Sequence, residues 1–368
     1  MIDPEVFNKF LVKKGVNFFC GVPDSCVFPF IKNIKKKYIL ANEGTAIAFA
    51  AGYYLSTKKL PLVFLQNSGL GNATDPLTNL ISKEVYSLPV VLLIGWRGHP
   101  KLKDEIQHRV QGKTLLKTLN GYGIKYQELK NKKSIPKIND LINYSKKKSR
   151  AVAILVNKKT FNNRPLLKGE GNNYSLKRAD VLLEILKQSS KSDKIFSSVG
   201  YNSRELYQIS EENKISRKIF YLVGAMGHTA AIALGSNIFD KKNNNTICID
   251  GDGSFIMHMG SLAINGTSEL KNFKHIILNN GSHESVGGQP TVGKKIDFSE
   301  IAKNCGYKES RKVSNYVELK NCINWISSND GPLMLEILIK NGSRPDLGRP
   351  KESPHKNKLE FMKNIIHE

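Results

Sequence analysis

Cysteine is scarce in this sequence, and long apolar runs are missing. The chain has 368 residues and only 5 cysteines, none of them in a C-x-x-C pair. Such scattered cysteines are typical neither of a disulfide framework nor of a zinc site, so we expect reduced thiols in a cytoplasmic protein. No apolar run approaches the roughly 20 residues that cross a bilayer, and the N-terminal sequence MIDPEVFNKF lacks the apolar core of a signal peptide. We therefore expect no membrane partner.

Acidic residues are few beside basic ones. The sequence has 56 Lys and Arg against 32 Asp and Glu, a net charge of +24. Such a charge can indicate nucleic-acid binding, so a non-catalytic basic nucleic-acid-binding protein is one alternative. The lysines, however, stand in short runs, at 35–37 and 146–148 for example, without interleaved aromatic residues that would stack on bases. We interpret most of the charge as solvated surface that can also steer anionic substrates, and we expect no nucleic acid partner.

A dinucleotide-binding motif is also missing, because no G-x-G-x-x-G follows the first predicted strand. This argues against a nicotinamide-dependent enzyme. What the sequence does contain is an alternation of apolar strands and helical segments. The predicted strands are 16–20, 38–41, 62–66, 90–94 and 151–156 in the first half, and 195–198, 220–223, 246–249, 274–278 and 333–339 in the second. This alternation predicts an α/β fold with mostly parallel sheets covered by helices on both faces.

The length of the chain predicts about two domains. A polar, glycine-containing stretch without periodicity, TFNNRPLLKGEGNNY, separates the two halves. We predict a first domain at 1–160, a linker at 161–174, and a second domain at 175–368 that ends in a polar C-terminal tail.

Residues 246–290 carry most of the chemical information. They read TICIDGDGSFIMHMGSLAINGTSELKNFKHIILNNGSHESVGGQP, in which one apolar strand ends in DGDG and the next ends in NN. Parallel strands of a βαβ unit bring such residues to one edge of the sheet, where open α/β sheets bind ligands. Asp252 and Asn280 supply one carboxylate and one amide oxygen. This donor set suits Mg²⁺, which is usually completed by water and phosphate oxygens.

The glycines of the same segment predict a phosphate site. Gly251 and Gly253 let the backbone turn and approach a ligand closely. The backbone amides of Gly253 and Ser254 would open the following helix, where a phosphate is favoured. A turn made of common turn-forming residues is the alternative interpretation of the isolated motif.

Gly-Asp-Gly, then 25 residues, then Asn-Asn resembles the signature of thiamine-diphosphate enzymes. In that family the Asp, the second Asn and a backbone carbonyl two residues later hold Mg²⁺ on the cofactor's diphosphate. The resemblance therefore implies thiamine diphosphate and Mg²⁺ as cofactors, with Asp252, Asn280 and Ser282 as metal ligands. The cofactor contacts that it implies are Glu43, Gly200, Gly224, Met226, Gly251, Asp252, Gly253, Ser254, Asn280 and Ser282.

The segment ANEGTAIAFAAGYYLSTKK resembles the part of the first domain in which this family carries a Glu. Glu43 stands at the junction of a predicted strand and helix, where a Glu also interacts favourably with the helix dipole. The resemblance implies that Glu43 instead hydrogen-bonds N1′ of the aminopyrimidine and exchanges the proton that activates the cofactor. In the family this Glu and the metal site come from different subunits. The resemblance thus implies a homo-oligomer with active sites at subunit interfaces.

Further segments resemble the phosphonopyruvate decarboxylases within this family: GVPDS, LQNSGLGNATDPLTNL, QHRVQG, VGAMGHTAAIALG and NNGSHESVGGQPTVG. The resemblance implies decarboxylation of 3-phosphonopyruvate to phosphonoacetaldehyde and CO₂, a step of phosphonate biosynthesis such as that of 2-aminoethylphosphonate. The length leaves no room for the central third domain of pyruvate decarboxylase.

Three residues join Glu43 as catalytic candidates. Asp24 and His108 match acid and base positions of related decarboxylases, and His283 flanks a predicted active-site loop. The cationic candidates for an anionic head group are Arg97, His108, Arg204, His283 and Lys294. Sulfopyruvate decarboxylase, or another thiamine-diphosphate-dependent 2-keto acid decarboxylase, stays an alternative, because the sequence does not count the charges in the pocket.

Overall fold

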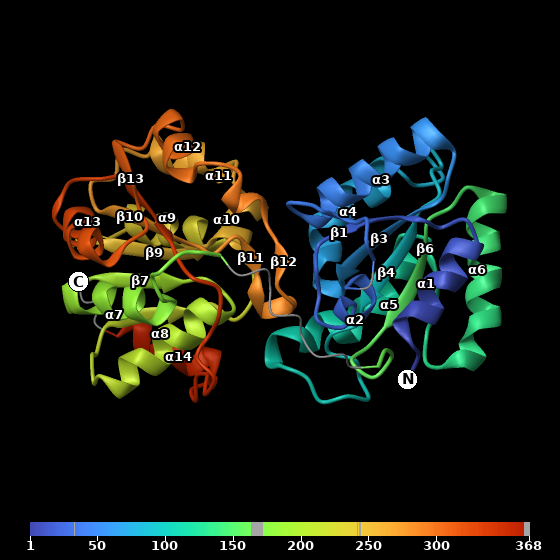
Figure 1. The fold of residues 1–368 in the computed structure, drawn as a ribbon, viewed down its shortest axis with the longest axis horizontal. Helices are drawn as coiled ribbons and strands as arrows, with labels where there is room; N and C mark the ends of the chain where they lie inside the picture. Colours follow the sequence, from blue (N-terminus) through green and yellow to red (C-terminus); the bar gives the residue numbers. More distant parts are fainter. Residues whose placement is uncertain (33, 163–171, 241, 243, 364–368) are drawn as a thin grey trace. The chain divides into compact units, whose positions relative to one another are not determined.

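The computed structural model describes residues 1–32, 34–162, 172–240, 242 and 244–363. The chain forms two compact units, Met1–Leu167 and Lys168–Glu368, which we call unit 1 and unit 2 (Figure 1). Each unit has a six-stranded parallel sheet with helices on both faces, so the predicted fold class is confirmed. Residues 163–171 of the predicted linker lie outside the described residues. No helix in the described ranges is both long and apolar enough to span a membrane.

The sheet of unit 1 has the strand order β2-β1-β3-β4-β6-β5. Its strands are β1 (Phe18–Gly21), β2 (Tyr38–Ile39), β3 (Pro61–Gln66), β4 (Val91–Gly95), β5 (Lys125–Glu128) and β6 (Val152–Val156). Helices α1 (Pro4–Lys13), α2 (Phe28–Ile31) and α6 (Ile135–Lys148) pack in one apolar cluster, and α3 (Glu43–Thr57), α4 (Leu70–Asn79) and α5 (Arg109–Gly121) pack in the other. The central strands are apolar along their whole length because both faces of the sheet are covered.

The sheet of unit 2 has the order β13-β14-β10-β9-β7-β8, which read in reverse is the topology of unit 1. Its strands are β7 (Lys194–Ser197), β8 (Lys218–Tyr221), β9 (Thr246–Gly251), β10 (Phe273–Asn279), β13 (Glu309–Val313) and β14 (Leu333–Leu338). One face carries α7 (Arg178–Gln188), α8 (Tyr201–Glu212) and α13 (Tyr316–Ser328). The other carries α9 (Thr229–Ile238), α10 (Asp252–Met257), α11 (Ser261–Gly266) and α12 (Phe298–Asn304).

The sequence did not predict the short antiparallel pair β11 (Ser282–His283) and β12 (Gln289–Pro290), nor two strands of the larger sheets, β5 and β13. Both β5 and β13 stand at an edge of their sheet, and their sequences, KYQE and ESRKV, are polar. An edge strand is paired on one side only and is partly solvated, so it needs no apolar run. The apolar pattern therefore identified the inner strands and the edge strands β2 and β8, whose sequences YI and KIFY are more apolar, but not β5 and β13.

Segments predicted as linker and tail contribute to the cores. Phe161 is buried in unit 1, with its ring centroid 5.8 Å from that of Phe30. The tail contains α14 (Pro354–Met362), whose Phe361 packs against Phe196 at 5.0 Å and Phe220 at 5.6 Å between ring centroids. The aromatic side chain at each position explains why a polar segment docks there.

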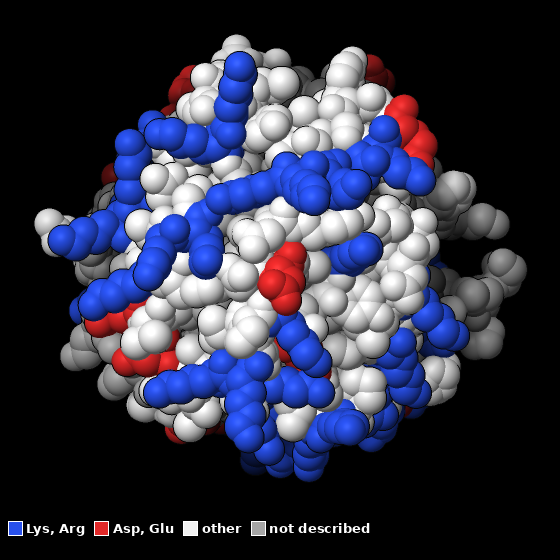
Figure 2. Space-filling model, turned by 90° about the vertical axis from the view of Figure 1, so that its right-hand side faces the viewer, with Lys and Arg blue, Asp and Glu red and all other residues white. Residues whose placement is uncertain are grey.

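The lysine runs lie on the surface, as predicted. Residues 35, 36 and 146–148 are exposed, and the latter run ends α6, where cations interact favourably with the helix dipole. Figure 2 shows Lys and Arg side chains spread across one face, with much uncharged surface between them. The charge is therefore distributed rather than gathered in one patch on that face.

Candidate active site

Polar residues gather at one end of the sheet of unit 2, where β7, β9 and β10 stop. The helix after β7 and the helices after β9 pack in different apolar clusters, on opposite faces of the sheet. Open α/β sheets bind ligands outside the carboxyl ends of the strands, at the point where neighbouring strands send their helices to opposite faces of the sheet. The predicted DGDG and NN segments both lie at this end.

Asp252 is a buried carboxylate at this end. It begins α10, is 3% exposed, and accepts hydrogen bonds from the Thr291 hydroxyl and the Asn280 backbone N–H. Burial raises the pKa of its carboxyl to about 6, because desolvation disfavours the charged form. A cation placed beside it would reverse that effect. The chemistry of this position therefore fits a metal ion.

The two asparagines that follow β10 make different contacts. Asn279 donates its side-chain amide to Glu336 Oε1 at 2.7 Å and to the Gly293 carbonyl at 2.8 Å. Its Oδ1 accepts from the Gly281 N–H at 3.0 Å. The amide group of Asn279 is thus fully engaged within the protein, and this residue supports the turn.

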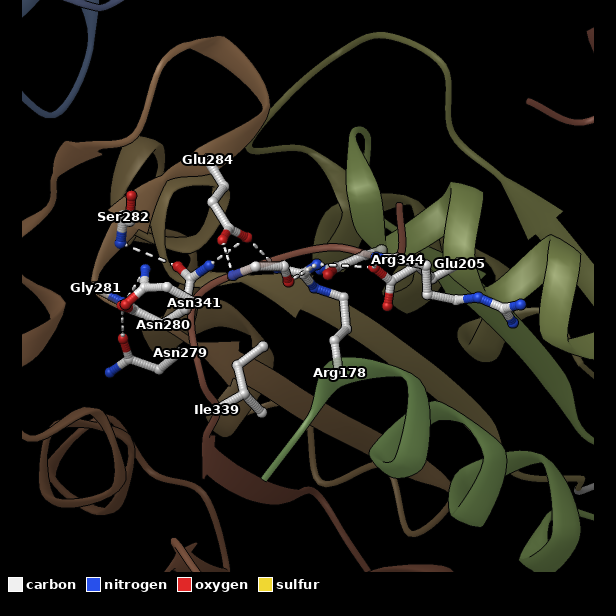
Figure 3. Close-up of polar contacts among 12 residues, drawn as sticks. Arg178, Glu205, Asn279, Asn280, Gly281, Ser282, Glu284, Ile339, Asn341 and Arg344 are labelled. Atoms are coloured by element: carbon white, nitrogen blue, oxygen red, sulfur yellow. Dashed lines mark hydrogen bonds and ion pairs between the residues drawn. The ribbon is translucent and has the colours of Figure 1, made fainter. Parts of the chain in front are cut away.

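Asn280 connects the other two predicted metal ligands. Its backbone N–H donates to Asp252, and its Oδ1 accepts from the Ser282 N–H at 3.0 Å. Its Nδ2 donates to Glu284 Oε2 at 2.8 Å (Figure 3). Unit 2 therefore brings Asp252, Asn280 and Ser282 together. A carboxylate, an amide oxygen and a backbone carbonyl are hard oxygen donors of the kind that Mg²⁺ takes, so the residues present fit the metal; their role as ligands stays a prediction.

Gly253, Met226 and His283 are neighbours around the start of α10. A Cβ at Gly253 would lie 2.6 Å from His283 Nδ1 and 3.5 Å from Met226 Cε, so only glycine allows this close contact. Burial lowers the pKa of the His283 imidazole to about 4. The lowered pKa favours the neutral imidazole near pH 7, and the roles predicted for His283 stay predictions.

A hydroxyl links the start of α10 to the segment before α9. Ser254 Oγ accepts from the Gly227 N–H at 2.9 Å and also hydrogen-bonds the carboxyl of Asp250. Asp250 is buried and bonds the hydroxyl of Ser198 as well, which follows β7. These hydrogen bonds connect the loop after β7, the loop after β9 and the loop before α9 to the buried carboxyl group of Asp250. All three loops are predicted to bind the cofactor.

The three remaining predicted glycines lie in these loops. Gly200 precedes α8 with φ +91°, a conformation that glycine adopts without strain. Gly224 lies between β8 and α9, and Gly251 ends β9. Each is at the carboxyl end of the sheet, as the resemblance implies, and their contact with a cofactor stays a prediction.

In unit 1, Glu43 is held at the first turn of α3. It is 5% exposed, and its Oε2 accepts from Asn72 Nδ2 at 2.8 Å. A Cβ at Gly69 would lie 2.2 Å from Glu43 Oε1, so the carboxyl group packs directly on this glycine. Burial raises the pKa of Glu43, and the hydrogen bond from Asn72 opposes the shift. A carboxyl in this setting can hold a proton or release it.

Asp24, which follows β1, is a buried carboxyl group that packs on a glycine, as Glu43 does. It is fully buried, and a Cβ at Gly95 would lie 2.0 Å from its Oδ1. Oδ1 accepts from the Cys26 N–H at 2.8 Å, whereas Oδ2 has no hydrogen-bond partner within the described chain. Burial raises the pKa of Asp24, and the charge of Arg97 opposes the shift. Asp24 is thus a second buried carboxyl at the carboxyl end of this sheet.

His108 is placed by close backbone packing. It precedes α5, and a Cβ at Gly98 would lie 2.0 Å from its carbonyl oxygen. Trp96 Nε1 donates to the Gly112 carbonyl at 2.8 Å. Residues 96–98, which follow β4, therefore contact the QHRVQG segment, which puts His108 beside the end of β4.

The other cationic candidates differ in their availability. Arg97 forms an ion pair with Asp104 at 2.7 Å, and Arg204 donates to the backbone carbonyls of residues 347 and 348. Lys294 is exposed, and the aliphatic part of its side chain lies over Gly281. A Cβ added at Gly281 would be 2.5 Å from Lys294 Cγ. Lys294 is therefore the candidate whose charge can reach solvent near the predicted metal ligands.

The sequence did not predict the side chains that hold the predicted site residues in position. Thr291, Glu284 and Asn72 lie within segments quoted for the resemblance, but no spacing rule points to them. Arg178 pairs with Glu284 from 106 residues away in the sequence, and only the fold reveals that contact.

Family models of two domains match the chain. The model described as thiamine pyrophosphate enzyme, N-terminal TPP binding domain, matches residues 4–119. The model described as thiamine pyrophosphate enzyme, C-terminal TPP binding domain, matches residues 198–337. The two matches fall in units 1 and 2 respectively.

Curated relatives match over most of the chain. Phosphonopyruvate decarboxylase from Streptomyces viridochromogenes is 31% identical, over 92% of this chain and 89% of that protein. Phosphonopyruvate decarboxylase from Streptomyces hygroscopicus is 30% identical, over 93% of this chain and 88% of that protein. Sulfopyruvate decarboxylase from Methanosarcina acetivorans is 27% identical, over 78% of this chain and 76% of that protein.

Proposed function

Because the chain belongs to the thiamine pyrophosphate enzymes, we propose that it is a carboxy-lyase that converts 3-phosphonopyruvate to phosphonoacetaldehyde and CO₂. The observation that carries the proposal is the similarity to two phosphonopyruvate decarboxylases over about nine tenths of both chains. The sulfopyruvate decarboxylase of Methanosarcina acetivorans is less similar over a smaller share of the chain, and a sulfopyruvate decarboxylase subunit beta that is 38% identical matches only 35% of the chain. Phosphonopyruvate is therefore the preferred substrate, and sulfopyruvate is the competitor that an assay must include.

The cofactors are thiamine diphosphate and Mg²⁺. When bound, thiamine diphosphate supplies a carbon nucleophile that accepts the electrons left by the departing CO₂. We assign Asp252, Asn280 and the Ser282 carbonyl to the metal. The close contact of Gly253 with Met226 and His283 places these two side chains beside the same loop.

We assign the proton transfers to residues of unit 1, namely the buried carboxyl groups of Glu43 and Asp24, and His108. Decarboxylation breaks the bond between C1 and C2 of the substrate, CO₂ leaves, and C2 gains a proton. Glu43 would exchange a proton with N1′ of the aminopyrimidine, and its raised pKa favours a carboxyl that can hold that proton. Asp24, buried with a raised pKa, and His108 are candidates for the proton that C2 gains.

We further propose that the enzyme is a homo-oligomer whose subunits share each active site. Exposed apolar side chains on the helix that carries Glu43 support an interface there. Phe49 is 41% and Leu55 66% exposed on α3, and the ring centroid of Tyr38 lies 5.3 Å from that of Phe49. In unit 2, Phe239 is 83% and Ile264 66% exposed, at the end of α9 and on α11. Exposed apolar groups of this kind are typical of surfaces that bind a partner.

The test of the proposed function is CO₂ release from three keto acids. Enzyme, thiamine diphosphate and Mg²⁺ are incubated separately with phosphonopyruvate, sulfopyruvate and pyruvate, and kcat/KM is measured for each. We expect phosphonopyruvate to exceed the others by at least one order of magnitude, the value of one lost charge-assisted contact. A preference for sulfopyruvate, or equal rates with pyruvate, would refute the substrate assignment.

A further inference from the structure

The side-chain amide of Asn280 has its orientation fixed by a carboxylate that lies four residues later. Asn280 is 3% exposed, and its Nδ2 donates to Glu284 Oε2 at 2.8 Å (Figure 3). An amide that gives its NH₂ to a carboxylate turns its oxygen to the opposite side. That oxygen, Oδ1, is the predicted metal ligand. In the flipped orientation the NH₂ would face the cation, and Glu284 would meet an oxygen.

Glu284 is in turn held by a buried arginine. Arg178, the first residue of α7, is 4% exposed and forms ion pairs with Glu284 and with Glu205. It also donates to the Gly342 carbonyl, and the Gly342 N–H donates to Glu284. The guanidinium offsets the charge of Glu284. Both oxygens of the Glu284 carboxylate are therefore used in contacts within the protein. The carboxylate orients Asn280 instead of competing with it for the metal.

Asn279, the neighbouring residue, makes the same kind of contact with a carboxylate but is not a predicted metal ligand. Asn279 also donates its NH₂ to a buried carboxylate, Glu336, which lies 3.7 Å from Lys312 Nζ. Its oxygen accepts from the Gly281 N–H, just as the oxygen of Asn280 accepts from the Ser282 N–H. Each asparagine of the pair therefore has its own carboxylate and cation. The two pairs are separable, because only Asn280 turns its oxygen toward Ser282 and, through its N–H, bonds Asp252.

We propose that Glu284, paired with Arg178, is a positioning residue that holds Asn280 Oδ1 toward Mg²⁺ and so sets the affinity for the metal and diphosphate. This inference rests on the proposed function, because it takes Asn280 to be a metal ligand. Side chains that orient metal ligands typically contribute 10–100-fold to metal affinity.

The first experiment measures binding, not turnover. Mg²⁺ is titrated by calorimetry into the wild type and Glu284→Ala at saturating thiamine diphosphate, after circular dichroism shows that both are folded. We expect the Kd for Mg²⁺ to rise about 10–100-fold in Glu284→Ala. The KM for Mg²⁺ should rise by the same factor, and kcat at saturating Mg²⁺ should stay within a few-fold. Glu205→Gln is the matched control, because Glu205 binds the same Arg178 and does not contact Asn280; its Kd should stay near that of the wild type.

A second pair of variants tests the orientation itself. Asn280→Asp places a carboxylate against Glu284, so like charges should weaken Mg²⁺ binding. Adding Glu284→Gln supplies an amide that donates to the carboxylate introduced at position 280, and either oxygen of that carboxylate can bind the metal. We therefore expect the double variant to bind Mg²⁺ at least tenfold more tightly than Asn280→Asp alone. Further weakening in the double variant would overturn the proposal.

The outcomes separate this inference from the proposed function. If the wild type binds no Mg²⁺ with thiamine diphosphate, the cofactor assignment fails. If the wild type binds them and Glu284→Ala binds them equally well, only the positioning role is refuted. A lower melting temperature with an unchanged Kd would likewise refute it, because it would show that Glu284 merely stabilises the fold.

Discussion

The Glu43 carboxyl group lies between the Asn72 amide and the backbone of Gly69. Asn72 Nδ2 donates to Glu43 Oε2 at 2.8 Å, and a Cβ at Gly69 would come within 2.2 Å of Oε1. The carboxyl is thereby buried at a strand end with a single side-chain donor. This environment raises its pKa and fixes its position at the same time.

Glu43→Gln should abolish most activity and preserve the fold. Gln keeps the size of the side chain but cannot exchange a proton with the aminopyrimidine. We expect kcat to fall by roughly 10² to 10⁴, the usual contribution of a positioned acid or base. The loss should be similar for every keto acid that is turned over, because activation precedes substrate choice. Steady-state CO₂ release is the measurement, and near-wild-type kcat would contradict the role of Glu43.

The same variant should be more stable than the wild type at neutral pH. Burial raises the pKa of Glu43 in the folded state above its ordinary value of 4.5. Below that value the Glu43 carboxyl is protonated in both the folded and the unfolded protein, so its ionisation does not change the free energy of unfolding. As the pH rises above it, the unfolded state loses a proton that the folded state keeps, so wild-type stability falls until the pH exceeds the folded pKa. The advantage of Glu43→Gln should therefore grow with pH over this window, by about 1.4 kcal/mol per unit of pKa difference.

Urea unfolding of the cofactor-free proteins at a series of pH values checks this prediction. Asn72→Ala is the companion variant. It removes the hydrogen bond that lowers the pKa of Glu43, so its loss of stability should increase with pH. A stability difference between wild type and Glu43→Gln that is independent of pH would show that Glu43 ionises normally in the folded protein.

Gly69→Ala and Gly71→Ala form a matched pair. A Cβ at Gly69 would collide with the Glu43 carboxyl, whereas a Cβ at Gly71 meets nothing within 4 Å. Displacing a catalytic group by about 1 Å can cost roughly 10²-fold in rate, so we expect that loss in kcat for Gly69→Ala. Gly71→Ala should keep its activity and gain roughly 0.5–1 kcal/mol, because alanine favours the helix. Equal activity of the two variants would show that Gly69 does not position Glu43.

The sequence could predict residues whose role depends on the ends of strands. Asp252 and Asn280 follow consecutive apolar strands of one βαβ unit, and parallel pairing brings such ends together. Glu43 is different, since its position at a helix start is equally explained by the helix dipole. It became a candidate through the family resemblance, and the structure adds the burial that its proposed chemistry needs.

The supporting residues and the edge strands could not be predicted in this way. Arg178 reaches Glu284 only because α7 begins beside the loop after β10, and no local pattern encodes that contact. The strands β5 and β13 lack apolar runs because they are half solvated at the sheet edges. The apolar periodicity of a sequence reports burial, so it identifies inner strands and leaves polar contacts between distant segments undetermined.

Mixing two inactive variants should restore activity if subunits share each site. Glu43→Gln removes the proposed proton-exchanging group, and Asp252→Ala removes a proposed metal ligand. A mixed oligomer would contain some sites with both residues intact, provided that the two come from different subunits. We expect the mixture to exceed either variant at least tenfold after subunit exchange, verified by native mass spectrometry. No recovery in verified mixed oligomers would show that Glu43 and Asp252 of each site belong to one chain.

Asp252→Ala should abolish the stabilisation that the cofactors give. A ligand at 100 times its Kd stabilises the folded protein by about 2.7 kcal/mol, and we expect this gain when Mg²⁺ and thiamine diphosphate are added together to the wild type. Without the Asp252 carboxylate the site would lack its proposed anionic metal ligand, and thiamine diphosphate would have to bind without the cation. Thermal unfolding with and without both cofactors gives the measurement. Asp330→Ala is the control, because Asp330 is exposed and pairs only weakly with Lys271 at 3.5 Å, so it should keep the full gain. If Asp252→Ala keeps that gain as well, the metal lies elsewhere.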